Sequence, residues 1–195
     1  MNWIRVLGIF LLLFPLQLHA QLVSDSNYIY RSVSVAAANP ENVFRINLSK
    51  TKLDKIPDEI FQFTKLRSLI LSKNNISILE ESIVKLSALE ELDLSNNELQ
   101  ELPLGICQLQ NLKVLKLNRN LLAKLPDCIG NMENLEVLEL WDNELSALPE
   151  SMTELKKLKL LELRGILFSD EEHERILSLL PNCTIFISPP CNCKF

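Results

Sequence analysis

The chain has 195 residues, 47% of them apolar; 41 residues are leucine and only 4 are glycine. This apolar content excludes an intrinsically disordered chain, and 5 cysteines in this length exclude a disulfide-dense miniprotein. The formal net charge of -5 provides no positive surface for phosphate backbones or anionic lipid, so we do not expect nucleic acid as a partner.

The first twenty residues resemble a cleavable secretory signal. Arg5 precedes an apolar stretch over residues 6–18, and Leu18-His19-Ala20 comes directly before Gln21. The stretch is too short for a bilayer core of about 30 Å, which needs roughly 20 residues, and no later segment stays uncharged for long enough. We therefore predict a signal peptide at residues 1–20, a secreted or periplasmic mature chain and no membrane span. The alternative is an N-terminal hydrophobic helix that stays attached.

Residues 21–42 are predicted to form an N-terminal cap. A helix is expected within residues 28–38, because apolar residues recur there at helix-like spacing. These residues are Tyr30, Val33, Ala37 and Ala38. Asn39-Pro40 should end the helix, since the residue before a proline avoids the α region.

Residues 43–168 repeat with a period of 23 and no insertion. Each copy reads L-x-x-L-x-L-x-x-N-x-L-x-x-L-P-x-x-I-x-x-L-x-x, as in the unit that starts at Leu89. The first leucines of the units are Leu66, Leu89, Leu112, Leu135 and Leu158, and Val43 takes the same place one period earlier. We expect five full units over residues 43–157 and a sixth strand over residues 158–168.

The spacing within a unit predicts a short strand followed by a return segment. Leu92 and Leu94 should point to one side of the strand, and Asp93 to the other. Stacked strands would form a parallel sheet, for which the L-P-x-x-I-x-x-L stretch supplies the return. Strands pack about 4.8 Å apart and helical returns roughly 8 to 10 Å apart, so the stack should bend with the sheet inside. We predict an α/β solenoid: a right-handed horseshoe segment with a parallel concave sheet and helical caps.

One column of asparagines is expected to be structural. Buried amides need hydrogen-bond partners, and stacked identical corners offer the backbone groups of the next turn. The column consists of Asn74, Asn97, Asn120 and Asn143. Thr51 and Ile166 interrupt it at the two ends, where a neighbouring turn is missing.

Residues 169–195 are predicted to form the C-terminal cap. Residues 169–172, Ser-Asp-Glu-Glu, have the pattern of a capping box, and Pro181 should end the helix that begins there. The apolar stripe of this helix comprises Ile176, Leu177 and Leu180. Residues 184–187 would add a last edge strand.

These features together resemble the leucine-rich repeat family, and in particular exported bacterial members of the 23-residue class. In these proteins an Ala...Asn-Pro...Val cap often precedes the first turn, as at Ala38-Asn39-Pro40 and Val43 here. A helix followed by Leu-Pro-Asn-Cys closes the array, as at residues 180–183. The repeat is also similar to that of plant Ras-group-related repeat proteins and animal Ras-pathway scaffolds. The resemblance implies protein binding without catalysis.

The outward positions of the concave strands are the expected binding surface, and apolar residues gather there in the C-terminal half. Tryptophan is enriched among residues that dominate binding, which makes Trp141 the leading anchor for a protein or peptide. The candidate partner-binding residues are Trp141, Val114, Val137, Leu160, Glu139 and Arg164. Alternatively, Trp141 covers a core edge, or stacks on Arg119 or Arg164.

Charges alternate in sign just before the strands, at Arg67, Glu90, Lys113, Glu136 and Lys159. Opposite charges on adjacent strands contribute about 0.2 to 1 kcal/mol per pair. Alternation leaves no field of one sign to steer a ligand, so we interpret this row as structural.

Export would permit disulfides. Cys183, Cys191 and Cys193 lie in the last thirteen residues, and we expect Cys183 to pair with Cys191 or Cys193, between which the sequence does not choose. A bridge from Cys107 to Cys128 is less expected, because it needs Cα atoms within about 7 Å across the wide outer side. The repeat positions of these two cysteines also differ by two.

Established catalytic and nucleotide-binding motifs are missing from the sequence, and we expect no enzyme activity, cofactor or metal. Three alternatives stay open. The chain could be an intracellular scaffold of the Ras-pathway kind, or a thiol oxidoreductase that uses Cys191-x-Cys193. Its edge strand or tail could also serve assembly with other subunits; the oligomeric state is not predicted.

Overall fold

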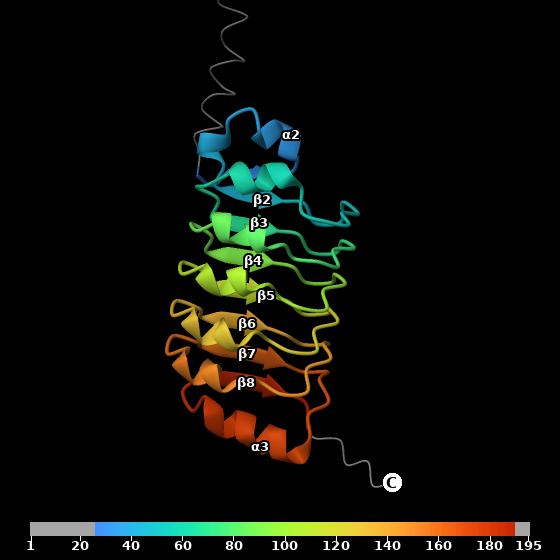
Figure 1. Cartoon of the computed structure of the whole chain (residues 1–195), viewed down its shortest axis with the longest axis vertical. Helices are drawn as coiled ribbons and strands as arrows, with labels where there is room; N and C mark the ends of the chain where they lie inside the picture. Colours follow the sequence, from blue (N-terminus) through green and yellow to red (C-terminus); the bar gives the residue numbers. More distant parts are fainter. Residues whose placement is uncertain (1–25, 190–195) are drawn as a thin grey trace, which may run out of the picture.

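A computed structural model describes residues 26–189, and within them eight parallel strands form one sheet in chain order (Figure 1). The register advances by one repeat per strand, so that Leu92 lies between Leu69 and Leu115. The predicted solenoid is confirmed. The strands are β1 (Ile29–Tyr30), β2 (Arg45–Asn47), β3 (Ser68–Ile70), β4 (Glu91–Asp93), β5 (Val114–Lys116), β6 (Val137–Glu139), β7 (Leu160–Leu163) and β8 (Thr184–Ile187).

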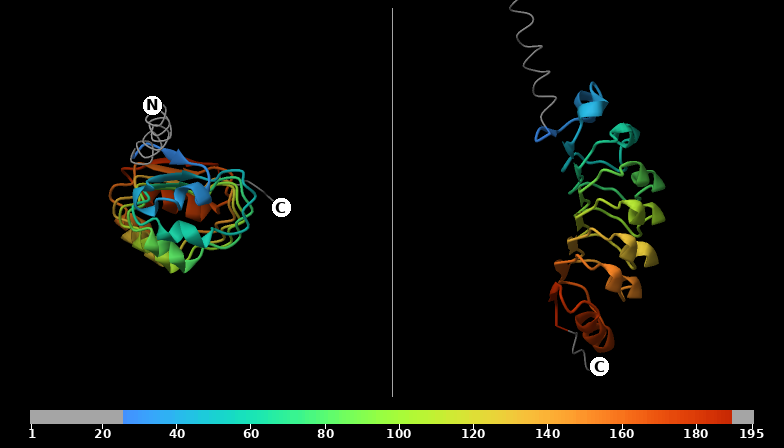
Figure 2. Two further views of the ribbon diagram at one scale, coloured as in Figure 1. Left: turned by 90° about the horizontal axis from the view of Figure 1, so that it is seen from above. Right: turned by 90° about the vertical axis from the view of Figure 1, so that its left-hand side faces the viewer.

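The returns are short 3-10 helices on the side opposite the sheet (Figure 2). They are η2 (Asp58–Gln62), η3 (Glu81–Lys85), η4 (Leu104–Gln108), η5 (Asp127–Asn131) and η6 (Glu150–Glu154). A proline precedes η2, η4, η5 and η6, with φ between -59° and -69°. Proline is restricted to this φ range and therefore favours the turn into the return. Glu80 occupies the same place before η3.

The core lies between the sheet and the 3-10 helices and consists of the repeated leucines and isoleucines. Leu89, Leu92, Leu94 and Ile106 are completely buried. Burying one such side chain contributes about 1.5 to 3 kcal/mol. Each turn contains only one layer of leucines. These leucines are therefore shielded from water only when another turn packs on each side.

The asparagines of the column connect consecutive turns. The side-chain amide of Asn97 donates to the backbone oxygens of Leu71 (3.1 Å) and Leu94 (2.9 Å), and its oxygen accepts from the backbone N–H of Ile76 (3.0 Å). Asn120 and Asn143 repeat this pattern one and two turns later. Each asparagine therefore satisfies backbone groups of its own turn and the preceding one.

The N-terminal cap differs from the expected helix over residues 28–38. Residues 29–30 form β1, which pairs with β2, and the helix α2 is limited to Val33–Ala36. A short 3-10 helix, η1 (Pro40–Asn42), follows. The difference arises because β2 would otherwise be an unpaired edge of the sheet. Residues 29–30 satisfy the backbone N–H and C=O groups of β2, a long-range contact that the spacing of apolar residues does not predict.

The C-terminal cap contains the predicted helix and edge strand, as α3 (Asp170–Leu179) and β8. Only half of the capping box forms: the Ser169 hydroxyl accepts from the Glu172 N–H (3.1 Å). The Glu172 carboxylate instead accepts from the Leu148 N–H (2.8 Å) and from Arg175, which also donates to the Leu148 oxygen. Burial raises the pKa of Glu172, but these hydrogen bonds and the Arg175 charge outweigh it and lower the pKa overall.

The expectation about Cys107 and Cys128 was wrong: they form a disulfide between η4 and η5, with Cα atoms 5.8 Å apart. The returns are single 3-10 turns, which are tighter than α-helices, so the outer side is narrower than an α-helical spacing suggests. Cys183 is a free thiol in the described part of the chain. Cys191 and Cys193 lie outside the described residues, and their pairing stays a prediction.

Replacing Cys107 with Ser should lower the free energy of unfolding by about 3 kcal/mol, because the disulfide restrains the unfolded chain between cysteines 21 positions apart. Urea unfolding followed by circular dichroism measures this change. Adding a thiol reductant to the unmodified protein should produce at least the same loss, and Gln108→Ser, at an exposed residue of η4, serves as the control without effect. Equal stability of the oxidised and reduced protein would exclude a stabilising bridge.

Candidate protein-binding surface

The outward side chains of β5, β6 and β7 form an apolar row across the concave sheet. Val114 pairs with Val137 and Val137 with Leu160, so these residues lie on consecutive strands about 4.8 Å apart. All three are half-buried, and each keeps part of its surface in contact with solvent. The structure thus brings together the aliphatic residues that the repeat pattern predicted to be neighbours.

Trp141 lies just after β6 and is half-buried. The guanidinium of Arg119 stacks over its ring at 4.6 Å from the centroid, and Arg119 also contacts Asp142 (3.4 Å). One of the two stacking alternatives, the one with Arg119, is therefore realised. Trp141 is four residues beyond Val137, and Glu139 lies between them at the intervening outward position. The stack fixes the ring in place, which reduces the entropy that a partner must overcome on contact.

The charged residues around the row already have partners. Glu139 pairs with Lys116 (3.5 Å), and Arg164 binds the buried carboxylate of Glu162 through two nitrogens (2.8 and 2.7 Å). Arg164 also stacks on Phe186 of β8, 5.4 Å from the ring centroid. The surroundings of the apolar row are thus preorganised by contacts within the chain.

Two residues of this surface were missed by sequence reasoning. Phe186 is 43% exposed on β8, where it pairs with Glu162 and adds an aromatic side chain to the concave face one strand beyond β7. Its signal was the alternating Thr-Ile-Phe-Ile strand, whose outward side we did not consider. Asn118 occupies the same repeat position as Trp141 one turn earlier; within the described residues its buried side-chain oxygen has no hydrogen-bond partner. An unpaired buried acceptor has no signal in the sequence.

The alternating charges form the expected pairs across strands. Glu90 contacts Lys113 (2.7 Å) and Arg67 (3.9 Å), and Glu136 contacts Lys159 (2.6 Å). The hydrogen bond from the lysine lowers the pKa of Glu90 and of Glu136. These pairs are exposed and therefore contribute little to stability.

The described residues contain no group of three His, Cys, Asp or Glu side chains that could hold a metal ion. Burial raises the pKa of the Cys183 thiol to about 11. A thiol with this pKa stays protonated near neutral pH and is a poor nucleophile. Between residues 26 and 189, none of the helices has the length and apolar character needed to cross a bilayer.

A family model for leucine-rich repeat regions matches residues 43–183. The chain therefore belongs to the leucine-rich repeat family. In sequence, no curated protein matches the chain significantly.

Solved structures with the same fold include bacterial and plant proteins. A leucine-rich repeat protein of Leptospira interrogans is 32% identical, with a TM-score of 0.63 over 75% of this chain and 43% of that protein. An internalin of Listeria monocytogenes is 20% identical, with a TM-score of 0.68 over 82% of this chain and 46% of its own. The ectodomain of the Arabidopsis thaliana receptor kinase GASSHO1/SCHENGEN3 is 30% identical, with a TM-score of 0.65 over 82% of this chain and 19% of that protein. The chain thus spans less than half of each protein.

Replacing Arg119 with Ala should expose the Trp141 ring and shift its fluorescence emission to longer wavelength. Loss of the cation-π contact should also lower the free energy of unfolding by about 0.5 to 1 kcal/mol. In a protein that starts at Gln21, Trp141 is the only tryptophan and reports the change without interference. Arg164→Ala is the matched control, since Arg164 stacks on Phe186 instead. A shift in the control but not in Arg119→Ala would contradict the assignment.

Proposed function

We propose that the chain is an exported, non-catalytic binding module that holds a protein or peptide on its concave sheet. Val114, Val137, Leu160 and Trp141 are the anchors, and Glu139 and Arg164 form the polar margin. The observation that carries the proposal is the apolar row on β5, β6 and β7, whose charged neighbours are paired within the chain. A partner can exclude water from such a row without burying an unpaired charge at Glu139 or Arg164.

One relative supports a protein or peptide as the ligand. The GASSHO1/SCHENGEN3 ectodomain was solved in complex with CASPARIAN STRIP INTEGRITY FACTOR 2. The repeats of this chain superpose on part of that ectodomain, and the family uses its stacked strands as an extended surface. We infer a macromolecular ligand of comparable extent, not a small molecule in an enclosed cavity.

Two observations support export. Residues 1–20, which lie outside the described part, resemble a secretory signal in sequence. The disulfide between Cys107 and Cys128 is of a kind that persists in oxidising compartments and is rare in the cytosol. Together they favour a secreted or periplasmic protein over an intracellular Ras-pathway scaffold. The thiol oxidoreductase alternative concerns Cys191 and Cys193, which lie outside the described residues.

Capture from the medium or cell envelope of the source organism, with immobilised protein variants, tests the proposal. Val137→Glu places an unpaired charge in the middle of the row and should abolish capture of the partner that the unmodified protein retains. Gln108→Glu, an exposed change on η4, should retain it. Once the partner is isolated, Trp141→Ala should weaken its affinity by at least about 2 kcal/mol. Undiminished capture by folded Val137→Glu would refute the concave site.

A further inference from the structure

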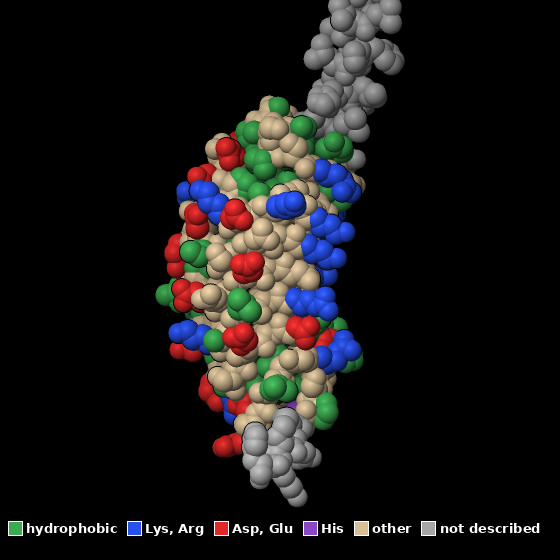
Figure 3. Space-filling view, turned by 90° about the vertical axis from the view of Figure 1, so that its right-hand side faces the viewer, with side chains coloured by type: hydrophobic (Ala, Val, Ile, Leu, Met, Phe, Trp, Pro, Cys, Tyr) green, Lys and Arg blue, Asp and Glu red, His purple; other side chains and the backbone are tan. Residues whose placement is uncertain are grey.

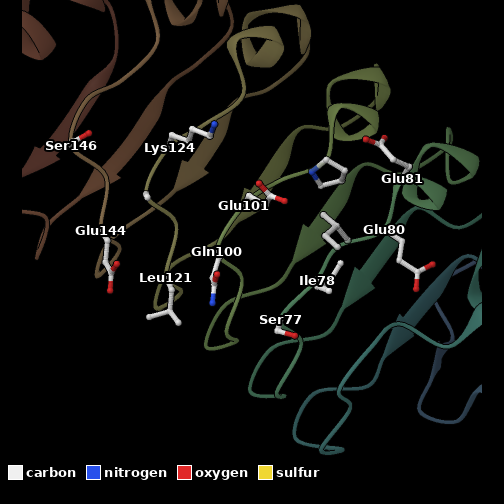
Figure 4. Close-up of a pocket in the computed structure, with 13 residues that line it drawn as sticks. Ser77, Ile78, Glu80, Glu81, Gln100, Glu101, Leu121, Lys124, Glu144 and Ser146 are labelled. Atoms are coloured by element: carbon white, nitrogen blue, oxygen red, sulfur yellow. The ribbon is translucent and has the colours of Figure 1, made fainter.

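A second surface with different chemistry lies on the flank where the chain runs from the strands toward the 3-10 helices. A groove of about 1160 Å³ crosses four consecutive turns there, from Ser77 to Ser146 (Figure 4). We call it the flank groove. A smaller hollow of about 410 Å³ around Leu104 shares Glu81, Glu101 and Lys124 with it and continues it toward η4 and η5.

The flank groove exposes large apolar side chains, which folding normally removes from water. Ile78 is 69% exposed and Leu121 is 41% exposed, and both line the groove. Leu104, in the adjoining hollow, is 65% exposed. These exposures exceed those of the half-buried residues of the concave row. Apolar side chains gathered in one hollow indicate a contact surface, whereas scattered ones do not.

The flank groove also contains glutamates without a counter-ion. Its lining has four glutamates and one lysine, which leaves a net charge of -3. Glu81 accepts hydrogen bonds from the N–H groups of Leu104 and Gly105. Among residues 26–189 no ion pair involves the other charged groups of the lining. These groups are Glu80, Glu101, Glu144 and Lys124.

The concave sheet differs in part, because Glu90, Glu136, Glu139 and Glu162 there have a basic partner. Glu91 and Asp93 of β4 accept hydrogen bonds from Ser68 and Ser95 instead. On the flank, most Lys and Arg side chains lie along one margin, and the acidic side chains lie mainly toward the centre and the opposite margin, with a few basic ones beside them (Figure 3). The glutamates come from three turns, Glu80 and Glu81 from the same one, and Ile78 and Leu121 lie among them (Figure 4). This arrangement suits a segment that presents basic and apolar side chains on one face better than a single metal ion.

The rim of the flank groove is held in a fixed shape. Glu81 Oε2 lies 2.7 Å from the N–H of Gly105, and a Cβ at Gly105 would come within 2.6 Å of the same oxygen. A larger residue at position 105 would therefore displace the Glu81 carboxylate from this contact between consecutive turns.

We propose that the flank groove binds an extended basic segment of a partner protein, in which basic and aliphatic side chains take turns at every second residue and so face the groove together. The basic groups pair with Glu80, Glu101 and Glu144, and the aliphatic groups cover Ile78 and Leu121. Four turns at about 4.8 Å or more span roughly 15 to 20 Å; five facing side chains need nine extended residues, about 26 Å long, whose terminal Lys or Arg side chains reach back to the outer glutamates. This site is independent of the concave row and would make the chain a module with two binding surfaces.

The probe is a fluorescent nine-residue peptide, Lys-Ser-Leu-Ser-Lys-Ser-Leu-Ser-Lys, which presents three lysines and two leucines on one face when extended. It is titrated into the full chain at physiological salt and followed by anisotropy. Two double variants, Ile78→Ser with Leu121→Ser and Glu101→Lys with Glu144→Lys, should each weaken binding by about tenfold or more. Leu167→Ser is the matched apolar control, because Leu167 is 77% exposed at the repeat position of Leu121. Glu59→Lys is the charge control, an exposed acid on η2. Both controls should bind like the unmodified chain.

The outcomes separate this site from the concave one. Val137→Glu should bind the peptide normally, so a failure of the concave proposal leaves this result unaffected. If Val137→Glu lost peptide binding while the variants of the flank groove kept it, the proposed flank site would be overturned. If an all-lysine peptide bound as tightly as the probe, or if Ile78→Ser with Leu121→Ser bound the probe as tightly as the unmodified chain, binding would be a general attraction between lysines and glutamates. Either result would overturn the proposed site. A dimer in sedimentation that the Ile78 variant dissociates would assign the groove to a second copy and would also overturn the proposal.

Discussion

The structure depends on the packing of each turn against two neighbours in the same register. A turn of 23 residues has only one layer of leucines and cannot bury them alone, so the burial of Leu92 requires Leu69 on one side and Leu115 on the other. The asparagine column fixes the same register with directional bonds to the backbone of two turns. Where a neighbour is missing, β1 and the Glu172–Arg175 pair of α3 provide the missing contacts.

The same register creates both proposed binding surfaces. Equivalent positions of successive turns line up. Val114, Val137 and Leu160 therefore form one row on the sheet, and the corner residues of four turns, from Ser77 to Ser146, form one groove on the flank. The two surfaces differ in their charges. Ion pairs within the chain hold the acids of β6 and β7 on the concave sheet, whereas the glutamates of the flank groove have no counter-ion among residues 26–189. A partner should therefore be recognised on the sheet by shape and apolar contact, and on the flank by charge as well.

The period in the sequence predicted the strands, their register and the neighbours on the concave face, because each follows from local spacing repeated without insertion. The period did not predict features that depend on a single contact between particular residues. Tyr30 joins a sheet edge and not a helix, and Cys107 meets Cys128 because the returns are narrow 3-10 turns. The flank groove had no signal in the repeat, since its residues occupy variable positions whose exposure depends on the corner geometry. Export and the pairing of Cys191 and Cys193 stay predictions.

The most direct test of this account is the replacement of Asn120 with Ala, followed by urea unfolding and hydrogen exchange. The change removes bonds to the Leu94 and Leu117 oxygens and to the Leu99 N–H. We expect a loss of about 2 to 4 kcal/mol and faster exchange in the turns on both sides. Asn111→Ala, at an exposed asparagine outside the column, should cost far less. A loss for Asn120→Ala no larger than in this control, with unchanged exchange in the neighbouring turn, would contradict the account.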